Sequence, residues 1–177
     1  MRTRKQRRED YQARTHLIHG SFSTGKWDYD HHVNPPITAS ASFRLSSLRR
    51  GLNGFAQFGE EVAPDHPIYI YDRLDEPTRG MLEENLAYAE RGEVAICYAS
   101  GMSAVSAALC ALAERDTEIV SHETIYGCTY SLMTNWLPRF GVITRFANLI
   151  DPCNVSRCAT AQTRVVYFET PVNPTMD

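Results

Sequence analysis

The sequence predicts an α/β fold in which a mostly parallel sheet has helices on both faces. From about Thr78 onward, short apolar runs of strand length alternate with longer segments whose apolar residues recur at helical spacing. Residues that end or cap helices, such as Gly92, Pro138 and Asp151, stand at the boundaries of these segments. Strands and helices that alternate in this way form crossover units, whose helices cover a parallel sheet.

Each element follows from a local pattern. In the first predicted helix Leu82, Leu86 and Ala89 share one face, and the run VAICY after it has the length and composition of a buried strand. We expect helices over residues 77–92, 102–114, 126–141 and 152–161, and strands over residues 94–98, 117–121, 142–147 and 164–169.

Residues 1–70 differ from the rest of the chain. They are rich in Gly, Ser, His and Pro and show only weak periodicity, and so long an irregular segment is uncommon inside a compact domain. We expect an N-terminal arm over residues 1–70 that contacts a partner subunit or is partly disordered. A domain over residues 71–177 follows it.

Composition and charge argue against several classes of function. The 177 residues carry a formal net charge of −3, which gives no reason to expect nucleic acid as a partner. No apolar run reaches the roughly 20 residues of a membrane-spanning helix, so no membrane partner is expected. The five cysteines, an odd number without CxxC spacing, argue against a disulfide framework or a metal site and favour a reducing cytoplasm.

Ligands of parallel α/β sheets bind beyond the carboxyl ends of the strands. Three segments are expected at that edge: YASGM, SHETIYG and ETPVNP. In the first, small residues open into a helix, whose first N–H groups are unpaired and whose dipole favours an anion. Gly101 allows the backbone to approach a ligand, and Ser100 offers a hydroxyl as a cap or a donor.

Two other motifs do not match this turn. A dinucleotide fingerprint needs GxGxxG, and a nucleophile elbow needs GxSxG, whose first glycine is replaced here by Tyr98. A serine hydrolase that uses Ser100 and His122 is therefore disfavoured.

The remaining polar residues favour a phosphorylated ring compound. Tyr126 has a ring that can stack on a planar cofactor, and Glu169 and Asn173 can contact polar ring substituents. Tyr71 and Arg73 supply a hydroxyl and a planar fork suited to phosphate. Together they favour pyridoxal 5'-phosphate. Packing for Tyr126, a plain strand-end carboxylate for Glu169 and a surface ion pair for Arg73 are the open alternatives.

A resemblance to a known family rests on collinear stretches that cover nearly the whole chain from Thr15. These stretches are THLIHG, NPPITASASF, YIYDRLDEPT, LEENLAYAERGE, YASGMSAVSAAL, IYGCTYSL and VVYFETPVNPTM. The chain resembles the Cys/Met-metabolism group of pyridoxal-phosphate enzymes, which act on cystathionine, methionine and O-acylated homoserine. The resemblance implies the fold-type I, aminotransferase-like large domain, with its C-terminal part absent.

The resemblance also implies how phosphate is bound. The N–H groups of Gly101 and Met102, next to Ser100, would hold the phosphate of the cofactor. Tyr71 and Arg73 would reach the phosphate in a neighbouring subunit, which implies self-association as a dimer or tetramer.

For the ring, the resemblance implies that Tyr126 stacks on it and acts as acid or base toward the leaving group, with Glu169 and Asn173 beside it. Cys128 follows Tyr-Gly, where methionine γ-lyases carry Cys and the related synthases and many cystathionine lyases carry Gly. This favours a methionine γ-lyase with a sulfur amino acid as substrate and Cys128 near it. Cystathionine γ-lyase and O-acetylhomoserine sulfhydrylase are the alternatives, as is a purely structural Cys128.

Two positions depart from the pattern of the family. Glu76 stands where the family usually has Asn before Pro-Thr, and Ala99 stands where Ser is common. Glu76 adds a negative charge near the expected phosphate-binding residues.

The chemistry of the family needs a lysine that binds the cofactor covalently, and that lysine follows the ETPVNP segment. The only lysines here are Lys5 and Lys26, neither in a matching motif. We therefore expect the first part of a longer enzyme, truncated before the catalytic lysine and inactive alone. A truncated, non-catalytic protein that binds an anion or partner subunits is the rival hypothesis.

Overall fold

The fold is taken from a computed structural model, which describes residues 12–19, 37–57, 68–173 and 176. The chain divides into two compact units, Met1–Cys97 and Tyr98–Asp177, which we call unit 1 and unit 2. Lys5, Lys26 and much of the expected N-terminal arm lie outside the described residues.

Unit 2 contains a parallel sheet of three strands. They are β1 (Glu118–His122), β2 (Ile143–Ala147) and β3 (Thr163–Tyr167), in the spatial order β2-β1-β3. All five residues of the central strand β1 are buried, because it has a neighbour at each edge and helices on its faces. The predicted parallel arrangement of these three strands is confirmed.

The strand expected over residues 94–98 is wrong. Val94 and Ile96 are 74% and 65% exposed, and no strand includes them. The N–H of Cys97 donates to a carboxylate oxygen of Glu83 at 2.7 Å, not to a neighbouring strand. An apolar run marks a possible strand, but a strand also needs a hydrogen-bonded partner, which the sequence pattern does not supply.

The helices of unit 2 fall where the periodicity predicts them. They are α5 (Gly101–Leu112), α6 (Gly127–Ser131) and α7 (Cys153–Cys158). α6 continues through the π-helical turn η1 (Leu132–Trp136) into the 3₁₀ turn η2 (Leu137–Phe140), which contains Pro138. Gly141 ends it with φ of 81°, a left-handed conformation that residues with a side chain rarely adopt. Asp151 accepts the N–H of Cys153 at 3.0 Å, as expected of a cap.

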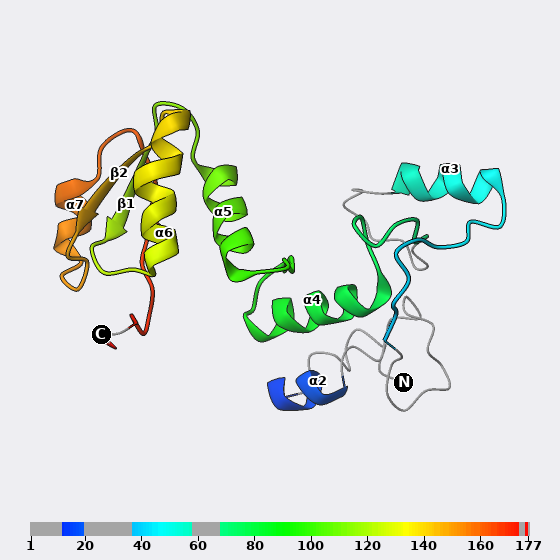
Figure 1. The fold of residues 1–177 in the computed structure, drawn as a ribbon. Coiled ribbons are helices and arrows are strands. Elements are labelled where there is room, and N and C mark those ends of the chain that lie inside the picture. Colours follow the sequence, from blue (N-terminus) through cyan, green and yellow to red (C-terminus); the bar gives the residue numbers. More distant parts are fainter. Residues whose placement is uncertain (1–11, 20–36, 58–67, 174–175, 177) are drawn as a thin grey trace. The chain divides into compact units, whose positions relative to one another are not determined.

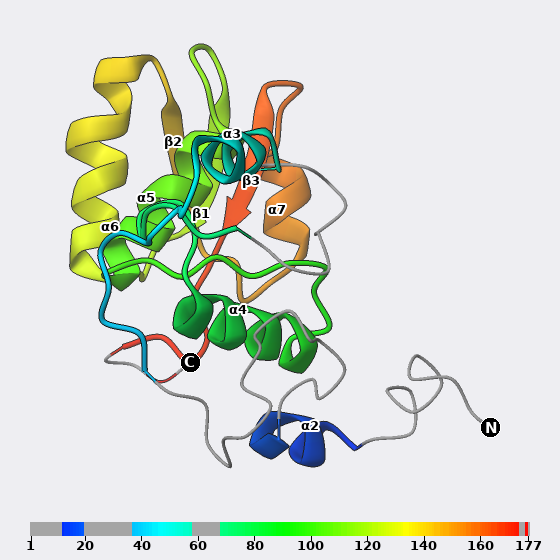
Figure 2. The same cartoon turned by 90° about the vertical axis from the view of Figure 1, so that its right-hand side faces the viewer.

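The core of unit 2 lies between the sheet and two of these helices. It consists of Leu109, Ile119, Met133, Leu137 and Val142, contributed by α5, β1, η1, η2 and the residue before β2. In Figure 1 the strands β1 and β2 lie between α7 on one side and α5 and α6 on the other. Figure 2 shows α6 and α7 on opposite sides in the turned view, so helices cover both faces as predicted.

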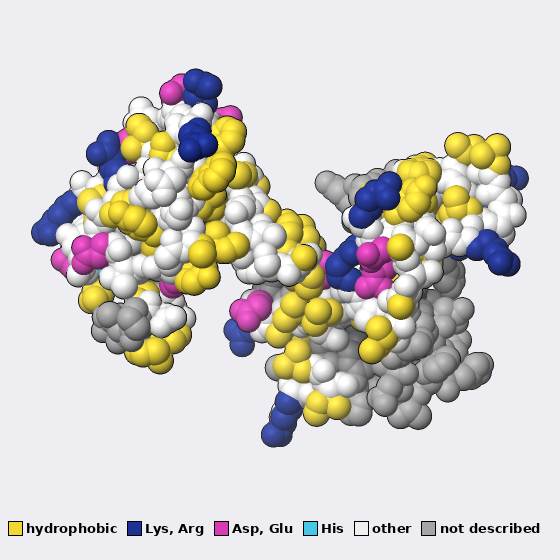
Figure 3. All heavy atoms as spheres, in the orientation of Figure 1, with side chains coloured by type: hydrophobic (Ala, Val, Ile, Leu, Met, Phe, Trp, Pro, Cys, Tyr) yellow, Lys and Arg dark blue, Asp and Glu magenta, His cyan; other side chains and the backbone are white. Residues whose placement is uncertain are grey.

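Unit 1 contains the helices α2 (Ala13–His19), α3 (Leu48–Gln57) and α4 (Pro77–Ala89). The first two lie within residues 1–70, where the sequence shows too little periodicity to predict them. Leu48, Leu52 and Phe55 of α3 are exposed although they recur at helical spacing, and Figure 3 shows apolar side chains at the surface of this helix. Among the described residues, no helix has the length and apolar character needed to cross a membrane.

Candidate functional site

The N-terminus of α5 presents free backbone donors. Ser100 is extended (φ −155°, ψ 157°), and its Oγ accepts the N–H of Ser103 at 3.2 Å and lies 2.8 Å from the Oγ of Ser103. The N–H of Ala104 donates to the carbonyl of Ser100. The N–H groups of Gly101 and Met102 have no acceptor among the described residues. No heavy atom lies within 4 Å of the position that a Cβ would take at Gly101, so the backbone there is open to a ligand.

The loop after β1 is fixed to the end of β3 by one carboxylate. The N–H of Tyr126 donates to Oε2 of Glu169 at 3.0 Å, and Oε1 of Glu169 accepts the hydroxyl of Tyr167 at 2.9 Å. β1 and β3 are neighbours in the sheet, so their carboxyl ends bring together residues that are 43 positions apart. Glu169 therefore positions the backbone of Tyr126, a role that the sequence did not predict.

The Tyr126 ring is half exposed, at 50%, and lies beside the thiol of Cys128. The hydrogen bond between the two side chains, and then the charge of Cys128, raise the pKa of Tyr126 above its ordinary value. Burial, countered in part by a hydrogen bond with Thr129, raises the pKa of Tyr167. Phenols of ordinary pKa are already protonated at neutral pH, and both shifts move the pKa further above that range, so each hydroxyl has a proton to donate.

A pocket of about 330 Å³ opens between the start of α5 and the helix that begins at α6. Its lining residues are Met102, Cys128, Ser131, Leu132 and Trp136. The hydroxyl of the buried Thr129 lies 3.6 Å from Sδ of Met102, which connects the two helices beneath the pocket. The sequence did not point to Ser131, Thr129 or Trp136. All three follow Tyr126 in one continuous helical stretch, so helical spacing from Tyr126 is the signal that could have indicated them.

Asn173 is the candidate that the structure does not bring into this group. It is exposed in the turn after β3, and in the described part of the chain it makes no hydrogen bond with Tyr126 or Glu169. In unit 2 the structure therefore places Met102 and Cys128 around one pocket, and it places Tyr126 in contact with Cys128 and Glu169.

Tyr71 and Arg73 lie in a tight turn of unit 1. The carbonyl of Tyr71 accepts the N–H groups of Leu74 at 2.9 Å and Asp75 at 3.1 Å, and Tyr71 pairs with Ser42 in an isolated antiparallel bridge. The guanidinium carbon of Arg73 lies 4.2 Å from the centre of the Tyr71 ring. The phenol of Tyr71 and the guanidinium of Arg73 therefore lie together in one turn.

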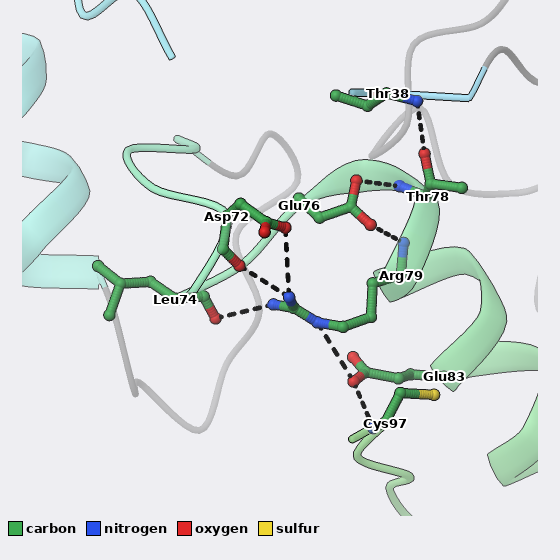
Figure 4. Close-up of polar contacts among 8 residues, drawn as sticks. All are labelled: Thr38, Asp72, Leu74, Glu76, Thr78, Arg79, Glu83 and Cys97. Atoms are coloured by element: carbon green, nitrogen blue, oxygen red, sulfur yellow. Dashed lines mark hydrogen bonds and ion pairs between the residues drawn. The ribbon is translucent and has the colours of Figure 1, made fainter. Parts of the chain in front are cut away.

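Behind this turn, Glu76 caps α4. Its carboxylate accepts the N–H of Thr78 at 3.0 Å and the N–H of Arg79, and it is buried. Figure 4 shows both contacts at the start of the helix. Glu76 stands where the family usually has Asn. Its negative charge lies at the positive end of a helix, where it is stabilised.

The structure does not support a serine hydrolase site. His122 is buried at the end of β1, and its Nδ1 accepts the N–H of Leu149 at 3.0 Å, while the hydroxyl of Ser100 is engaged with Ser103. In the described ranges of the chain, no group of three or more His, Cys, Asp or Glu residues could hold a metal ion.

The residues of unit 2 fit a planar phosphorylated cofactor. The open backbone at Gly101 and the two free N–H groups suit a phosphate at a helix N-terminus. The exposed Tyr126 ring offers a stacking surface.

Comparison with known proteins identifies the group to which these features belong. The family model described as Cys/Met metabolism PLP-dependent enzyme matches residues 14–177. The L-methionine gamma-lyase of Treponema denticola is 36% identical over 141 residues, which are 80% of this chain and 33% of that protein. The cystathionine beta-lyase of Bacillus subtilis is 34% identical over 169 residues, 96% of this chain and 39% of that protein. The chain thus spans about a third of the length of the curated relatives that it matches.

Solved structures of such enzymes have the same fold. One is the crystal structure of a Campylobacter jejuni protein assigned as an O-acetylhomoserine (thiol)-lyase, with N'-pyridoxyl-lysine-5'-monophosphate. It is 27% identical with a TM-score of 0.79, covering 95% of this chain and 39% of that one. The cystathionine gamma-lyase of Lactobacillus plantarum, complexed with L-serine, is 26% identical with a TM-score of 0.74, covering 94% and 39%. These likenesses confirm the fold-type I class and pyridoxal 5'-phosphate as the cofactor of the family.

Proposed function

This chain belongs to the Cys/Met metabolism PLP-dependent enzyme family, and we propose that the protein is a lyase that releases the thiol of L-methionine by γ-elimination. The observation that carries this proposal is the grouping of Met102 at the start of α5 with Cys128 around one pocket, with Tyr126 against Cys128. The methionine gamma-lyases among the relatives support this choice within the family. Cystathionine γ-lyase and O-acetylhomoserine sulfhydrylase are the alternatives.

Unit 2 would hold the cofactor through its backbone and one ring. The N–H groups of Gly101 and Met102, with the hydroxyl of Ser100, would bind the phosphate at the positive end of α5. The ring of Tyr126 would stack on the pyridine, with Asn173 and Glu169 beside it. When bound there, pyridoxal phosphate supplies an electron sink for carbanions formed on the substrate.

Tyr126 would act as the general acid. A phenol with the ordinary pKa of 10.0 is protonated at neutral pH, and Cys128 raises the pKa of Tyr126 further, so the side chain has a proton that it can deliver to the departing sulfur. Oε2 of Glu169 accepts the N–H of Tyr126 at 3.0 Å, which holds the backbone from which the phenol extends. The pocket lined by Cys128, whose side chain contacts that of Tyr126, would take the thioether part of the substrate.

The remaining parts of the proposal concern organisation. Residues 71–177 would form the first part of the cofactor domain, and residues 1–70 an arm that contacts a partner subunit. The exposed apolar face of α3 supports this contact. Tyr71 and Arg73 would bind the phosphate in a neighbouring subunit of a dimer or tetramer. A reducing cytoplasm fits five cysteines that form no disulfide.

The test is an assay of the native protein with pyridoxal phosphate and L-methionine, cystathionine or homocysteine, measuring free thiol and 2-oxo acid. Tyr126→Phe is expected to lower kcat by about 100-fold or more, the usual effect of losing a general acid. Tyr130→Phe is the matched control, because Tyr130 is exposed on the same helix and packs on Phe146. Turnover that requires O-acetylhomoserine and sulfide would contradict the lyase in favour of a sulfhydrylase.

A second candidate function is a non-catalytic protein that binds the cofactor or partner subunits. The observation that favours it is that the proposed phosphate contacts are the backbone N–H groups of Gly101 and Met102, which can bind an anion whether or not catalysis follows. Borohydride reduction of the native protein with pyridoxal phosphate, followed by peptide mass spectrometry, separates the two. A pyridoxyl-lysine supports the lyase, and bound cofactor without one supports the non-catalytic protein.

A further inference from the structure

The turn that carries Arg73 has little local support. Asp72 and Arg73 are both exposed. The turn is closed by two N–H groups on the carbonyl of Tyr71, and the N–H of Asp72 donates to the carbonyl of Ala41 at 3.1 Å. These contacts fix the backbone before Arg73. None of them involves the carbonyls of Asp72 and Leu74, the residues on either side of Arg73.

Arg79 holds both of these carbonyls. Its NH1 donates to the carbonyl of Asp72 at 2.7 Å, and its NH2 donates to the carbonyl of Leu74 at 3.2 Å. Figure 4 shows the guanidinium between the two oxygens, which belong to the residues immediately before and after Arg73. A planar fork can bind two acceptors in a fixed geometry, which a lysine ammonium cannot do.

Arg79 also binds the one carboxylate next to Arg73. Its NH1 lies 3.5 Å from Oδ1 of Asp72. An exposed pair of this kind adds little to stability, but it determines where the carboxylate lies. Without Arg79, the nearest cation along the chain is Arg73 itself, and an Asp72–Arg73 pair would compete with any anion for that guanidinium.

The guanidinium is in turn fixed from the helix side. Its Nε lies 3.5 Å from Oε1 of Glu83, one turn further along α4, and the same oxygen accepts the N–H of Cys97. Arg79 is 25% exposed, against 54% for Asp72, so it is the better ordered member of the pair.

We infer that Arg79 is a positioning residue for phosphate binding: it clamps the turn around Arg73 and keeps Asp72 away from it, so that Arg73 stays free for a phosphate. This inference rests on the proposed function, in which Arg73 binds the cofactor phosphate. Nothing in the sequence motif singles Arg79 out, because the two hydrogen bonds by which it holds the turn are to backbone carbonyls.

The experiment compares the affinities of the assembled apo protein for pyridoxal 5'-phosphate and for pyridoxal, which lacks the phosphate. The ratio of the two affinities isolates the phosphate contribution. Arg79→Gln is expected to lower this ratio about tenfold, a change of about 1.4 kcal/mol. Adding Asp72→Asn to Arg79→Gln is expected to recover about threefold, and Asp72→Asn alone to leave the ratio unchanged. Arg49→Gln, an exposed arginine of α3, is the control.

The outcomes separate this inference from the proposed function. A ratio unchanged by Arg73→Gln, or a protein that binds neither compound, would remove Arg73 from the site and overturn both. A ratio lowered by Arg73→Gln but not by Arg79→Gln would overturn only the role of Arg79. No recovery in the double variant would mean that Arg79 does not act by keeping Asp72 away. If Arg79→Gln does not fold, Arg79→Lys keeps the charge near Asp72 but loses the fork, and an intermediate ratio is expected.

Discussion

The two units of this chain are stabilised in different ways, although each contains an arginine–carboxylate network. In the described part of the chain, the buried apolar side chains of unit 1 are those of Ile70, Pro77 and Ala87. Unit 2 contains more of them, and most are grouped around β1. In unit 1 the turn that carries Arg73 is held by Arg79, which contacts two backbone carbonyls and the carboxylate of Asp72.

The network of unit 2 is added to a packed core. Arg145 on β2 makes two hydrogen bonds to the carboxylate of Glu118 on β1, at 3.0 and 2.7 Å, and the hydroxyl of Thr160 donates to the same group at 2.7 Å. The residue next to Glu118 is Ile119, which is fully buried. Polar contacts therefore reinforce a geometry that apolar packing already determines in unit 2, whereas in unit 1 they determine the geometry themselves.

The largest effect expected from this difference is in the core of unit 2. Ile119→Ala should lower the free energy of unfolding by about 2–5 kcal/mol, because it removes a fully buried side chain and leaves a cavity. Ile143→Ala is the control, since Ile143 is 54% exposed in the adjacent strand, and should cost less than about 1 kcal/mol. Chemical denaturation followed by circular dichroism measures both. Equal effects of the two variants would mean that the core around β1 does not dominate the stability of unit 2.

The second effect concerns the network of unit 2 and depends on pH. The hydrogen bonds from Arg145 and then from Thr160 lower the pKa of Glu118 below its ordinary value of 4.5. A carboxylate whose pKa is lower in the folded state stabilises the fold above the unfolded pKa, and this contribution is lost as the pH falls through the folded pKa. Glu118→Gln should therefore lower Tm at pH 7.

The same variant should approach the wild-type protein as the pH falls below 4.5, where the carboxylate of Glu118 takes up a proton. Thermal melts from pH 7 down to pH 3 test this. Glu114→Gln, an exposed glutamate before β1, should show no such convergence. A Tm difference between Glu118→Gln and wild type that does not depend on pH would show that packing at this position matters more than its charge.

The same difference between the units explains what the sequence could predict. In unit 2, α5, the helix that begins at α6 and the three strands pack on a common core. Their apolar residues therefore recur at regular spacing, which can be recognised in a sequence. α2 was not predicted because it is a short helix in a segment without a clear period, and α3 was not predicted because its three apolar residues at helical spacing stand alone in that segment. The run at 94–98 was misread because an apolar run gives no information about whether a partner strand lies beside it.

Candidate site residues could be named where they belong to motifs. Gly101 and Tyr126 were named from residue type and position, Cys128 from the resemblance to methionine γ-lyases, and Glu169 was expected with Tyr126 at the same edge of the sheet. The contacts of Arg79 could not be named, because backbone carbonyls carry no signature in the sequence. The same limit hid the contact between Thr129 and Met102, which depends on how two helices pack.

A third prediction concerns unit 1 and is smaller. Glu76→Ala removes the side chain that accepts the N–H groups of Thr78 and Arg79, and losing such a cap costs about 1 kcal/mol. Glu76→Asn keeps a capping oxygen and should lower the free energy of unfolding by only about 0.3 kcal/mol. Hydrogen exchange at the amides of Thr78 and Arg79 gives a local measurement. Faster exchange in Glu76→Ala but not in Glu76→Asn is expected, and equal exchange in both would contradict capping by Glu76.

The smallest predicted effect concerns unit 2, at the contact between the exposed side chains of Tyr126 and Cys128. Cys128 raises the pKa of the half-exposed Tyr126, so Cys128→Ala should move that pKa back toward its ordinary value of 10.0. The sign follows from the hydrogen bond and charge of the thiol, both of which favour the protonated phenol. NMR titration of ¹³C-labelled tyrosine, assigned with Tyr126→Phe, measures it, and Cys110→Ala on α5 is the control. An unchanged pKa would mean that the side chain of Cys128 does not act on the phenol of Tyr126, and its contacts would then be confined to the pocket that it lines with Met102.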